Sequence, residues 1–510
     1  MKELMVSIPS DAAGMRLSDW LADNGYPISA DCGGRGTCGK CAVRVLDGTF
    51  FADSLCKTNL IPDDRGTILA CHAWCAPTGA TIVCSAHSGS GLTTFSAAPN
   101  KLGTSDKEAD QLGAAIDIGT TTLAAALINL HTGEVLRTAS RLNPQCSFGA
   151  DVMSRIGAAA DPKTLARMQS LIHSAIREML SELCPRSPLW VLTVAGNTTM
   201  LHLLLGISPE GMGAYPFTPA FTEGKTLSGD ALGLPVKTVA ILPSASAFIG
   251  ADVISGIYAT DMASAKDPVL LCDIGTNGEM VLFTGQDHGA RWYTASAAAG
   301  PALEGAGIST GVGGIAGAVC SVSSSGHGDP RFIIRTIEDK EPIGICGSGL
   351  IDLAAAMLAR ADLDETGYLE EDPFPYAKSS TDDLCITQED IRALQLAKSA
   401  IRAGMEALCD AAGIAHAALS CVYLAGGLGC YMNVGSAVAI GLLPKDLHDR
   451  ITAVGNTALG GAASLAYHPE DTEQLQRIAN SCKCIDLNRS EVFNTLFIEH
   501  MMFPDTEDSI

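Results

Sequence analysis

The chain is poor in aromatic side chains, at 5% of its 510 residues, and poor in charged ones, at 17%. With 47% apolar residues it is too hydrophobic for a disordered chain. Basic residues are scarce: 33 Lys and Arg stand against 56 Asp and Glu, for a formal net charge of -23. Because so acidic a surface repels polyanions, we expect neither nucleic acid nor an anionic membrane as a partner.

Long apolar runs are also missing from the sequence. No stretch approaches the roughly 20 apolar residues that cross a bilayer, and residues 1–9 lack the apolar core of a secretory signal. We therefore expect a cytoplasmic protein. Disulfides are rare in that compartment, so the 18 cysteines are expected to be metal ligands or buried apolar side chains.

What the chain does have is length and glycine. Its 510 residues exceed one ordinary domain, and its 53 glycines suit the tight turns of an α/β protein. We predict a small cysteine-rich domain over residues 1–86, followed by a Ser- and Gly-rich linker over 87–112. Residues 113–510 are predicted to form a large α/β domain with lobes near 113–265 and 266–510.

Local patterns predict several elements. Alternating apolar residues favour strands at Leu4–Ile8 and Cys41–Leu46, the second closed by a turn at Asp47-Gly48. Helical spacing predicts a helix over Leu17–Asn24. In the large domain, caps predict helices that begin at Asp161 and Thr387. Further strands are predicted at 114–118, 123–130, 280–283 and 422–424.

A glycine-rich loop carries Cys32, Cys38 and Cys41 with the spacing Cys-x5-Cys-x2-Cys, and Cys71 follows later. Four thiolates are what a [2Fe–2S] cluster needs, and the glycines let the backbone wrap it closely. Zinc is the alternative, although zinc ribbons usually pair two Cys-x2-Cys knuckles. The stretch resembles the β-grasp ferredoxin domain, which implies Cys71 as the fourth ligand; Cys75 remains an alternative.

Two strand ends carry the same Asp-Ile-Gly-Thr turn, and a second strand follows each turn. Glycine lets a phosphate approach the backbone, threonine hydroxyls donate to phosphate oxygens, and the aspartate can hold Mg²⁺. The candidates are Asp117, Gly119, Thr120, Thr121 and Thr122 in the first copy and Asp273, Gly275, Thr276, Asn277 and Gly278 in the second. Asn277-Gly278 is predicted to form a tight hairpin turn.

Three further features complete a recognisable order of motifs along the chain. A strand runs into Gly426-Gly427, a Gly-rich helix opens near Asn456, and Asn197 lies in a segment between the two Asp-Ile-Gly-Thr turns. This order resembles the superfamily of actin, Hsp70 and the sugar kinases, which implies two ribonuclease-H-like lobes with ATP between them. Gly426 and Gly427 would then approach the adenosine. For Gly347, beside Ser348 in another glycine-rich stretch, packing alone is an equally good explanation.

Joined to an iron–sulfur module, this domain resembles the reductive activators of corrinoid enzymes. The matching stretches are 32–41, 143–156, 195–206, 244–252, 300–308, 345–352, 386–404 and 493–504. The resemblance implies that ATP drives an electron from a low-potential donor through the cluster to the corrinoid protein of a methyltransferase system, reducing Co(II) to Co(I).

The resemblance also suggests roles for the candidates. Asp117 and Asp273 would position Mg²⁺ and water, with Asp252 and Glu279 as further acidic candidates. Thr120, Thr121, Thr276 and Asn277 would hold the phosphates. A homodimer is left open. The competing hypotheses are a small-molecule kinase with an accessory redox domain, a donor to a non-corrinoid enzyme, a dehydratase-type activator and an electron carrier that uses no ATP.

Overall fold

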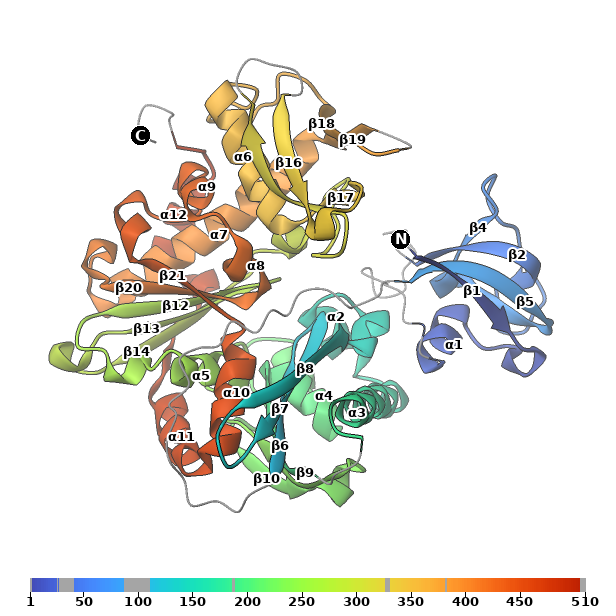
Figure 1. The fold of residues 1–510 in the computed structure, drawn as a ribbon, viewed down its shortest axis with the longest axis horizontal. Helices are drawn as coiled ribbons and strands as arrows, with labels where there is room; N and C mark the ends of the chain where they lie inside the picture. Colours follow the sequence, from blue (N-terminus) through green and yellow to red (C-terminus); the bar gives the residue numbers. More distant parts are fainter. Residues whose placement is uncertain are drawn as a thin grey trace. The chain divides into compact units, whose positions relative to one another are not determined.

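The computed structural model describes residues 2–24, 26, 41–86, 111–185, 189–325, 331–380 and 383–504. The chain forms two compact units (Figure 1). The N-terminal unit takes in the described residues up to Ile241, and the C-terminal unit those from Leu242 onward. Residues 87–110 of the predicted linker lie outside the described residues. Among the helices of the described residues, none combines the length and apolar character of a membrane span.

The N-terminal unit opens with a small sheet whose strands run in the order β1-β5-β2-β3, with β4 paired to β2. The bounds are β1 Lys2–Ile8, β2 Ala42–Phe51, β3 Asn59–Leu60, β4 Thr67–Leu69, β5 Trp74–Ala86 and helix α1 Leu17–Asp23. Leu17 and Leu21 of the helix are fully buried in a core with Ile82 of β5. Both predicted strands and the predicted helix are present.

The predicted turn at Asp47-Gly48 is wrong, because β2 continues through both residues to Phe51. The pairing of β2 with β5 shifts register on either side of them, which is the signature of a β-bulge. Gly48 has φ +95°, and a Cβ there would lie 2.7 Å from the Cα of Ala80. The Asp-Gly pair therefore bends a continuous strand instead of ending it.

The second sheet of the N-terminal unit has the order β10-β11-β9-β6-β7-β8. The bounds are β6 Leu112–Ile118, β7 Thr122–Asn129, β8 Val135–Leu142, β9 Leu189–Gly196, β10 Lys225–Ser228, β11 Val236–Ile241, α2 Val152–Ala158, α3 Pro162–Leu183 and α4 Thr198–Leu205. The predicted cap is confirmed: Asp161 accepts a hydrogen bond from the Thr164 amide before the proline that opens α3.

The large sheet of the C-terminal unit repeats this plan. Its strand order is β21-β20-β12-β13-β14-β22. Strands β12, β13 and β14 are antiparallel, and β20 and β21 extend them as parallel strands on the β12 side. In the N-terminal unit, β6, β7 and β8 are likewise antiparallel, and β9 and β11 extend them as parallel strands on the β6 side. This repetition confirms two ribonuclease-H-like lobes. The bounds are β12 Val269–Ile274, β13 Gly278–Phe283, β14 Trp292–Ala297, β20 Cys421–Ala425, β21 Ile451–Gly455 and β22 Lys483–Cys484.

Helices and two small sheets complete the C-terminal unit (Figure 1). The helices are α5 Ala251–Ala259, α6 Gly347–Arg360, α7 Gln388–Ala412, α8 Gly426–Tyr431, α9 Val434–Ala439, α10 Thr457–Tyr467, α11 Thr472–Ser481 and α12 Glu491–Glu499. The small sheets contain β15 Ala318–Ser324, β16 Phe332–Thr336, β17 Gly344–Ile345, β18 Phe374–Lys378 and β19 Asp383–Ile386. Helix α7 begins with the predicted cap, a capping box between Thr387 and Asp390.

The hairpin between β12 and β13 is present, but its turn is not Asn277-Gly278. Gly278 already pairs with Ile274 as the first residue of β13, and the Gly275 amide donates to the Asn277 carbonyl at 2.9 Å. A Cβ at Gly278 would lie 2.1 Å from Cδ1 of Ile401 on α7. Gly278 therefore leaves room for the Ile401 side chain of this helix.

Helix α7 also holds the end of α12 and the residues that follow it. Lys398, which is 1% exposed, donates to the carbonyl oxygens of His500 at 2.6 Å and Met502 at 2.7 Å. Gln395 donates to the carbonyl of Met501 at 2.8 Å, and Ser399 donates to that of Phe497. Burial lowers the pKa of Lys398 to about 7. These buried donors fix residues 497–502 along α7.

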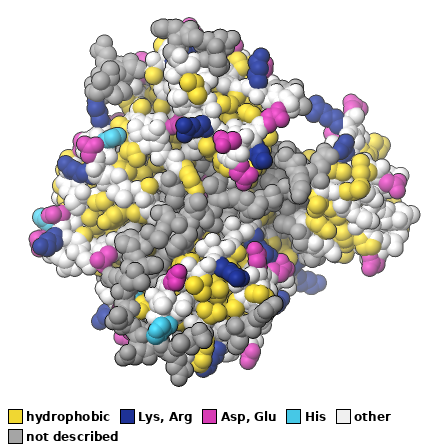
Figure 2. Space-filling model, viewed as in Figure 1, with side chains coloured by type: hydrophobic (Ala, Val, Ile, Leu, Met, Phe, Trp, Pro, Cys, Tyr) yellow, Lys and Arg dark blue, Asp and Glu magenta, His cyan; other side chains and the backbone are white. Residues whose placement is uncertain are grey.

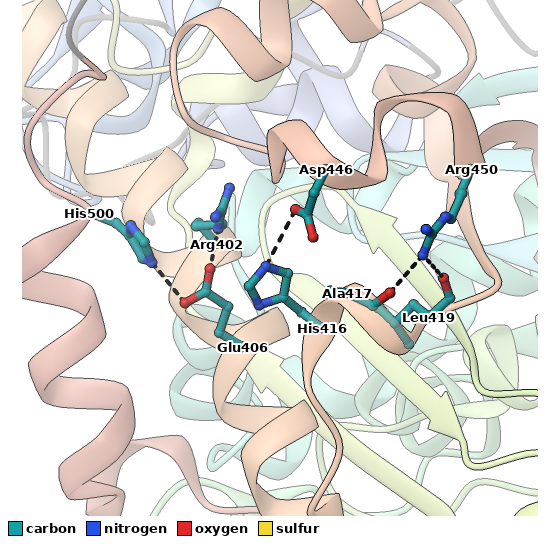
Figure 3. Close-up of polar contacts among 8 residues, drawn as sticks. All are labelled: Arg402, Glu406, His416, Ala417, Leu419, Asp446, Arg450 and His500. Carbon is teal, nitrogen blue, oxygen red and sulfur yellow. Dashed lines mark hydrogen bonds and ion pairs between the residues drawn. The ribbon is translucent and has the colours of Figure 1, made fainter. Parts of the chain in front are cut away.

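A carboxylate on the same helix adds a charged contact (Figure 3). Glu406 accepts from Arg402 at 2.5 Å and lies 3.1 Å from Nε2 of His500. Burial alone would raise the pKa of Glu406, but the hydrogen bond with His500 and the charge of Arg402 lower it overall to about 2. Nearby, His416 lies 3.4 Å from Asp446, and Arg450 binds the backbone before β20.

We expect Glu406→Gln to lower the free energy of unfolding by about 2 kcal/mol at pH 7, because it removes hydrogen bonds to an ionised group. Since the folded-state pKa lies below the ordinary value of 4.5, this stabilisation is present above pH 4.5 and fades as the pH falls toward 2. Urea unfolding of both proteins at a series of pH values measures the difference.

Glu371→Gln is the matched control, because Glu371 pairs with Arg331 at 3.0 Å while both side chains are about half exposed. We expect it to change stability by less than about 0.5 kcal/mol. A Glu406→Gln deficit that stays constant between pH 7 and pH 3 would contradict the ionic role of this carboxylate.

Candidate functional site

Two of the four predicted cluster ligands lie in the described residues, and they lie together. Cys41 directly precedes β2, and Cys71 lies in a short 3-10 turn over Ala70–His72. Their Sγ atoms are 3.2 Å apart, and the two residues are 1% and 2% exposed. The Ala70 amide donates to the Cys41 carbonyl at 3.0 Å, which fixes the two loops together. Cys32 and Cys38 lie outside the described residues.

Cys75, the alternative fourth ligand, has different surroundings. It lies on β5 opposite Phe50 and is 0% exposed. Burial raises the pKa of its thiol to about 12, with a further contribution from Cys56. Cys71 differs from Cys75 in its geometry, because its sulfur lies 3.2 Å from that of Cys41, another predicted ligand. This short distance favours Cys71 as the fourth ligand.

The first Asp-Ile-Gly-Thr turn joins β6 to β7 in the N-terminal unit. Asp117 lies near the end of β6, Gly119 to Thr121 form the turn, and Thr122 begins β7. The Gly119 amide donates to the Thr122 carbonyl at 3.1 Å. Asn197 caps α4 by accepting from the Met200 amide at 3.0 Å, and its own amide donates to Oγ1 of Thr120 at 3.1 Å. Four of the predicted residues, Gly119, Thr120, Thr122 and Asn197, are thus connected by hydrogen bonds around one turn.

Behind this turn lie donors that our sequence analysis did not single out. Asn143, which is 0% exposed, donates through its side chain to the Gly119 carbonyl at 2.8 Å and through its backbone to the Thr121 carbonyl at 2.8 Å. Arg155 of α2 donates to the Thr120 carbonyl at 2.6 Å. Both residues fall in the stretch 143–156, which the sequence marked only as a whole.

The second turn joins β12 to β13 in the C-terminal unit. Asp273 and Glu279 face each other directly in the register of these two antiparallel strands. Thr276 donates to Oε2 of Glu304 at 2.8 Å, and a Cβ at Gly275 would lie 3.3 Å from Oε1 of the same side chain. Glu304 was also not predicted, although it lies in the stretch 300–308. Like charges placed directly opposite destabilise a sheet.

These carboxyl groups perturb one another. Burial, followed by the charges of Asp252 and Glu304, raises the pKa of Asp273 to about 7. Burial raises the pKa of Asp252, in the first turn of α5, to about 6. The pKa of Glu279 is raised well above its ordinary value by burial and then by Asp252 and Asp273. A bound cation would relieve this repulsion, so the donor set fits a hard divalent metal ion.

The acids do not form a ready-made metal cage. Among the described residues, no three His, Cys, Asp or Glu side chains are placed to hold one ion together. Mg²⁺ commonly binds through one or two carboxylates and completes its shell with water and substrate phosphates. The arrangement is therefore compatible with a metal ion that arrives with a nucleotide.

The remaining candidates lie at helix starts. Gly426 has φ +85°, and a Cβ there would lie 2.5 Å from Oδ1 of Asp273, so a side chain would displace that carboxylate. The Cβ position of Gly427 is open. Asn456 caps α10 by accepting from the Leu459 amide at 2.8 Å.

The first residues of α6 have contacts within the protein. A Cβ at Gly347 would lie 1.8 Å from the Leu303 carbonyl, which accounts for this glycine by packing. The Ser348 hydroxyl donates to the Cys320 carbonyl at 2.9 Å. Their assignment to a cofactor stays a prediction.

Family models divide the chain in three. A model of the 2Fe-2S iron-sulfur cluster binding domain matches residues 5–75, the RACo middle region matches 112–265, and the C-terminal domain of RACo, the ASKHA domain, matches 267–510. The chain is 31% identical to corrinoid activation enzyme RamQ of Eubacterium limosum over 433 residues, which are 78% of this chain and 72% of the relative. The chain belongs to the RACo family.

A second related protein and a solved structure agree with membership of the RACo family. The reductase of the Co(II) methylated amine-specific corrinoid protein of Methanosarcina barkeri is 28% identical, over 76% of each chain. A solved structure of a reductive activator for a corrinoid, iron-sulfur protein is 28% identical with a TM-score of 0.71, covering 98% of this chain and 97% of that chain. This RACo-family chain thus combines a [2Fe–2S] ferredoxin-type domain with an ASKHA domain of the ATP-binding class.

Proposed function

We propose that the protein is an ATP-dependent reductive activator of a corrinoid protein. One electron from a low-potential donor passes through the protein to cobalt, and Co(II) becomes Co(I) while ATP and water become ADP and phosphate. The observation that carries the proposal is the presence, in one chain, of a buried thiol pair in a ferredoxin-type domain and two Asp-Ile-Gly-Thr turns on matching hairpins. Membership of the RACo family supports it.

ATP is needed because the transfer runs uphill. Each 100 mV by which the donor falls short costs about 2.3 kcal/mol for one electron. We propose that Thr120, Thr121, Thr276 and Asn277 hold the phosphates and that Asp117 and Asp273 position Mg²⁺ and water. Asp252 and Glu279 shape the charge of the metal site, and the glycine at 426 leaves room for Asp273. Gly427 and Asn456 belong to the proposed nucleotide site.

The proposed cluster ligands are Cys32, Cys38, Cys41 and Cys71. A [2Fe–2S] cluster supplies one-electron transfer when bound. The protein holds the thiol groups of Cys41 and Cys71 together in a buried site, which excludes water and helps to set the reduction potential. The domain boundaries at 86, 112 and 265 are part of this proposal.

The ferredoxin-type domain offers a surface on which redox partners can dock. Figure 2 shows apolar side chains gathered on this domain, and Met5, Leu55 and Ile61 are 69%, 70% and 85% exposed. Contiguous apolar patches mark protein contact sites, and we propose that these side chains contribute to one. We propose that the electron donor and the corrinoid protein bind in turn, in the cytoplasm. A homodimer is compatible with this scheme and is tested by the mass of the purified protein in solution.

The test is a spectroscopic assay of the full chain. The anaerobically purified protein is mixed with a Co(II) corrinoid protein and a low-potential reductant, and the visible spectrum is followed with and without Mg-ATP. We expect Co(I) to appear only when ATP is present. ATP hydrolysis without any change of cobalt, across several corrinoid proteins, would reject the proposal in favour of a kinase or another redox target.

A further inference from the structure

The stretch 143–156 resembles the family, yet the scheme above gives it no role. It runs from the end of β8 through Asn143 into helix α2, where Arg155 lies in the last turn. Arg155 is 0% exposed and is one of the largest fully buried side chains among the described residues. Arginine is almost never fully buried unless it is paired, so its partners need an explanation.

The partners of Arg155 carry no charge. Its Nε donates to the Gly149 carbonyl at 2.9 Å, its Nη2 to the Thr120 carbonyl at 2.6 Å, and its Nη1 contacts Sδ of Met200 at 3.3 Å. Asp151 lies on the same helix, but its carboxylate caps the helix start, accepting from the Ser154 amide at 2.8 Å and hydroxyl at 2.7 Å. The guanidinium therefore brings a buried positive charge to the back of the first Asp-Ile-Gly-Thr turn.

This charge persists at neutral pH. Burial lowers the pKa of Arg155, while Cys146 and Asp151 oppose that effect, and the result is about 10. Asp151 is the carboxylate that opposes this burial, and its oxygens already accept from Ser154, so a second anion near the guanidinium would further offset the cost of desolvating its charge. An anion bound on the other side of the turn would provide that compensation.

The carbonyl oxygens of the turn are held by donors of the protein. The carbonyl of Gly119 is held by Asn143, that of Thr120 by Arg155 and that of Thr121 by the Asn143 amide. A phosphate is bound by N–H groups and repelled by carbonyl oxygens. Donors that hold every carbonyl of the turn from behind leave the turn's threonine groups for a ligand.

We propose that Arg155 is the positioning residue of the phosphate turn 119–122: it fixes the Thr120 carbonyl and supplies the positive charge that favours the nucleotide's phosphates. Arg155 acts through Thr120 and does not itself touch the ligand. The inference rests on the proposed ATP function. Within it, Arg155 determines the preference for phosphorylated nucleotides over adenosine.

The test compares nucleotide affinities of the full chain by calorimetry, using Mg-ATP, Mg-ADP and adenosine as probes. We expect Arg155→Met, which keeps the volume but removes the charge and the hydrogen bonds, to weaken Mg-ATP at least about tenfold. Adenosine affinity should change less than about twofold, because adenosine lacks the phosphates. Arg155→Lys keeps the charge but not the fork of donors, so its affinity for Mg-ATP should lie between those of the wild type and Arg155→Met.

Arg141→Met is the matched control. Arg141 lies in the same unit on β8, pairs with Glu178 and Glu182, and its side chain is 29% exposed. It should leave all affinities unchanged. Thermal melting identifies any variant that does not fold. If Arg155→Met does not fold, the ratio of ATP to adenosine affinity of Arg155→Lys tests the inference instead.

Two results would overturn the inference. One is an Arg155→Met protein that melts normally and binds Mg-ATP as the wild type does. The other is an equal loss of ATP and adenosine affinity, which indicates a merely structural role. Absence of ATP binding by the wild-type chain would overturn the proposed function as well, so the two failures are distinguishable.

Discussion

Cys71→Ala should yield a protein without the visible spectrum of a [2Fe–2S] cluster, and reduction of Co(II) should fall to the background. Removing one of four thiolates leaves an iron with an incomplete ligand set. Cys75→Ala should keep the cluster, because Cys75 lies on β5 opposite Phe50, whereas the Cys71 sulfur is the one paired with that of Cys41.

Anaerobic reconstitution followed by visible and electron paramagnetic resonance spectra measures both variants. Cys75→Ala is the matched control, since each change removes one buried sulfur from the same domain. The loss of the cluster in Cys75→Ala, together with its retention in Cys71→Ala, would assign the fourth ligand to Cys75. A zinc content in place of iron would reject the [2Fe–2S] assignment altogether.

Asp273→Asn should reduce the rate of ATP hydrolysis by roughly 10²–10³-fold, since a carboxylate that positions Mg²⁺ stabilises several kcal/mol of charge in the transition state. The same change should raise the stability of the nucleotide-free protein by about 1 kcal/mol, because it removes a buried carboxyl group whose ionised form is disfavoured by burial, Asp252 and Glu304. Loss of activity with a gain of stability is typical of a site selected for function.

Phosphate release and thermal melting measure the two effects. Asp267→Asn is a suitable control, because Asp267 lies just before β12 and its side chain is 64% exposed. Within the part of the chain that the structure describes, its ion-pair partner is His288, at 3.6 Å. It should change neither quantity. An Asp273→Asn protein with full ATP hydrolysis would remove Asp273 from the proposed metal site.

The sequence was sufficient for much of the architecture. The repeated Asp-Ile-Gly-Thr turns predicted two related lobes, and both turns lie on matching hairpins next to a parallel strand. Caps at Asp161 and Thr387 predicted their helices, because capping depends on a few neighbouring residues. The resemblance to corrinoid activators came from stretches throughout the chain and agrees with the family comparisons.

What the sequence could not reveal depends on contacts between distant residues. Asp-Gly at 47–48 predicted a turn, but β5 pairs across it and makes it a bulge. Asn-Gly at 277–278 failed similarly, because Gly278 pairs with Ile274 as the first residue of β13, where it leaves room for Ile401 on a helix more than a hundred residues later. Arg155 and Glu304 carry no local pattern that distinguishes them from surface charges, and only the fold places them beside the two turns.

The donors on α7 also affect when the C-terminal unit can finish folding during synthesis. Lys398 leaves the ribosome 102 residues before the carbonyl of His500 that it binds, an interval of roughly 5–20 s at 5–20 residues per second. During that time the ammonium group has none of its native acceptors at 500 and 502 and must stay in water or on a chaperone. We therefore expect the C-terminal unit to reach its final packing only once residues near 503 have been synthesised.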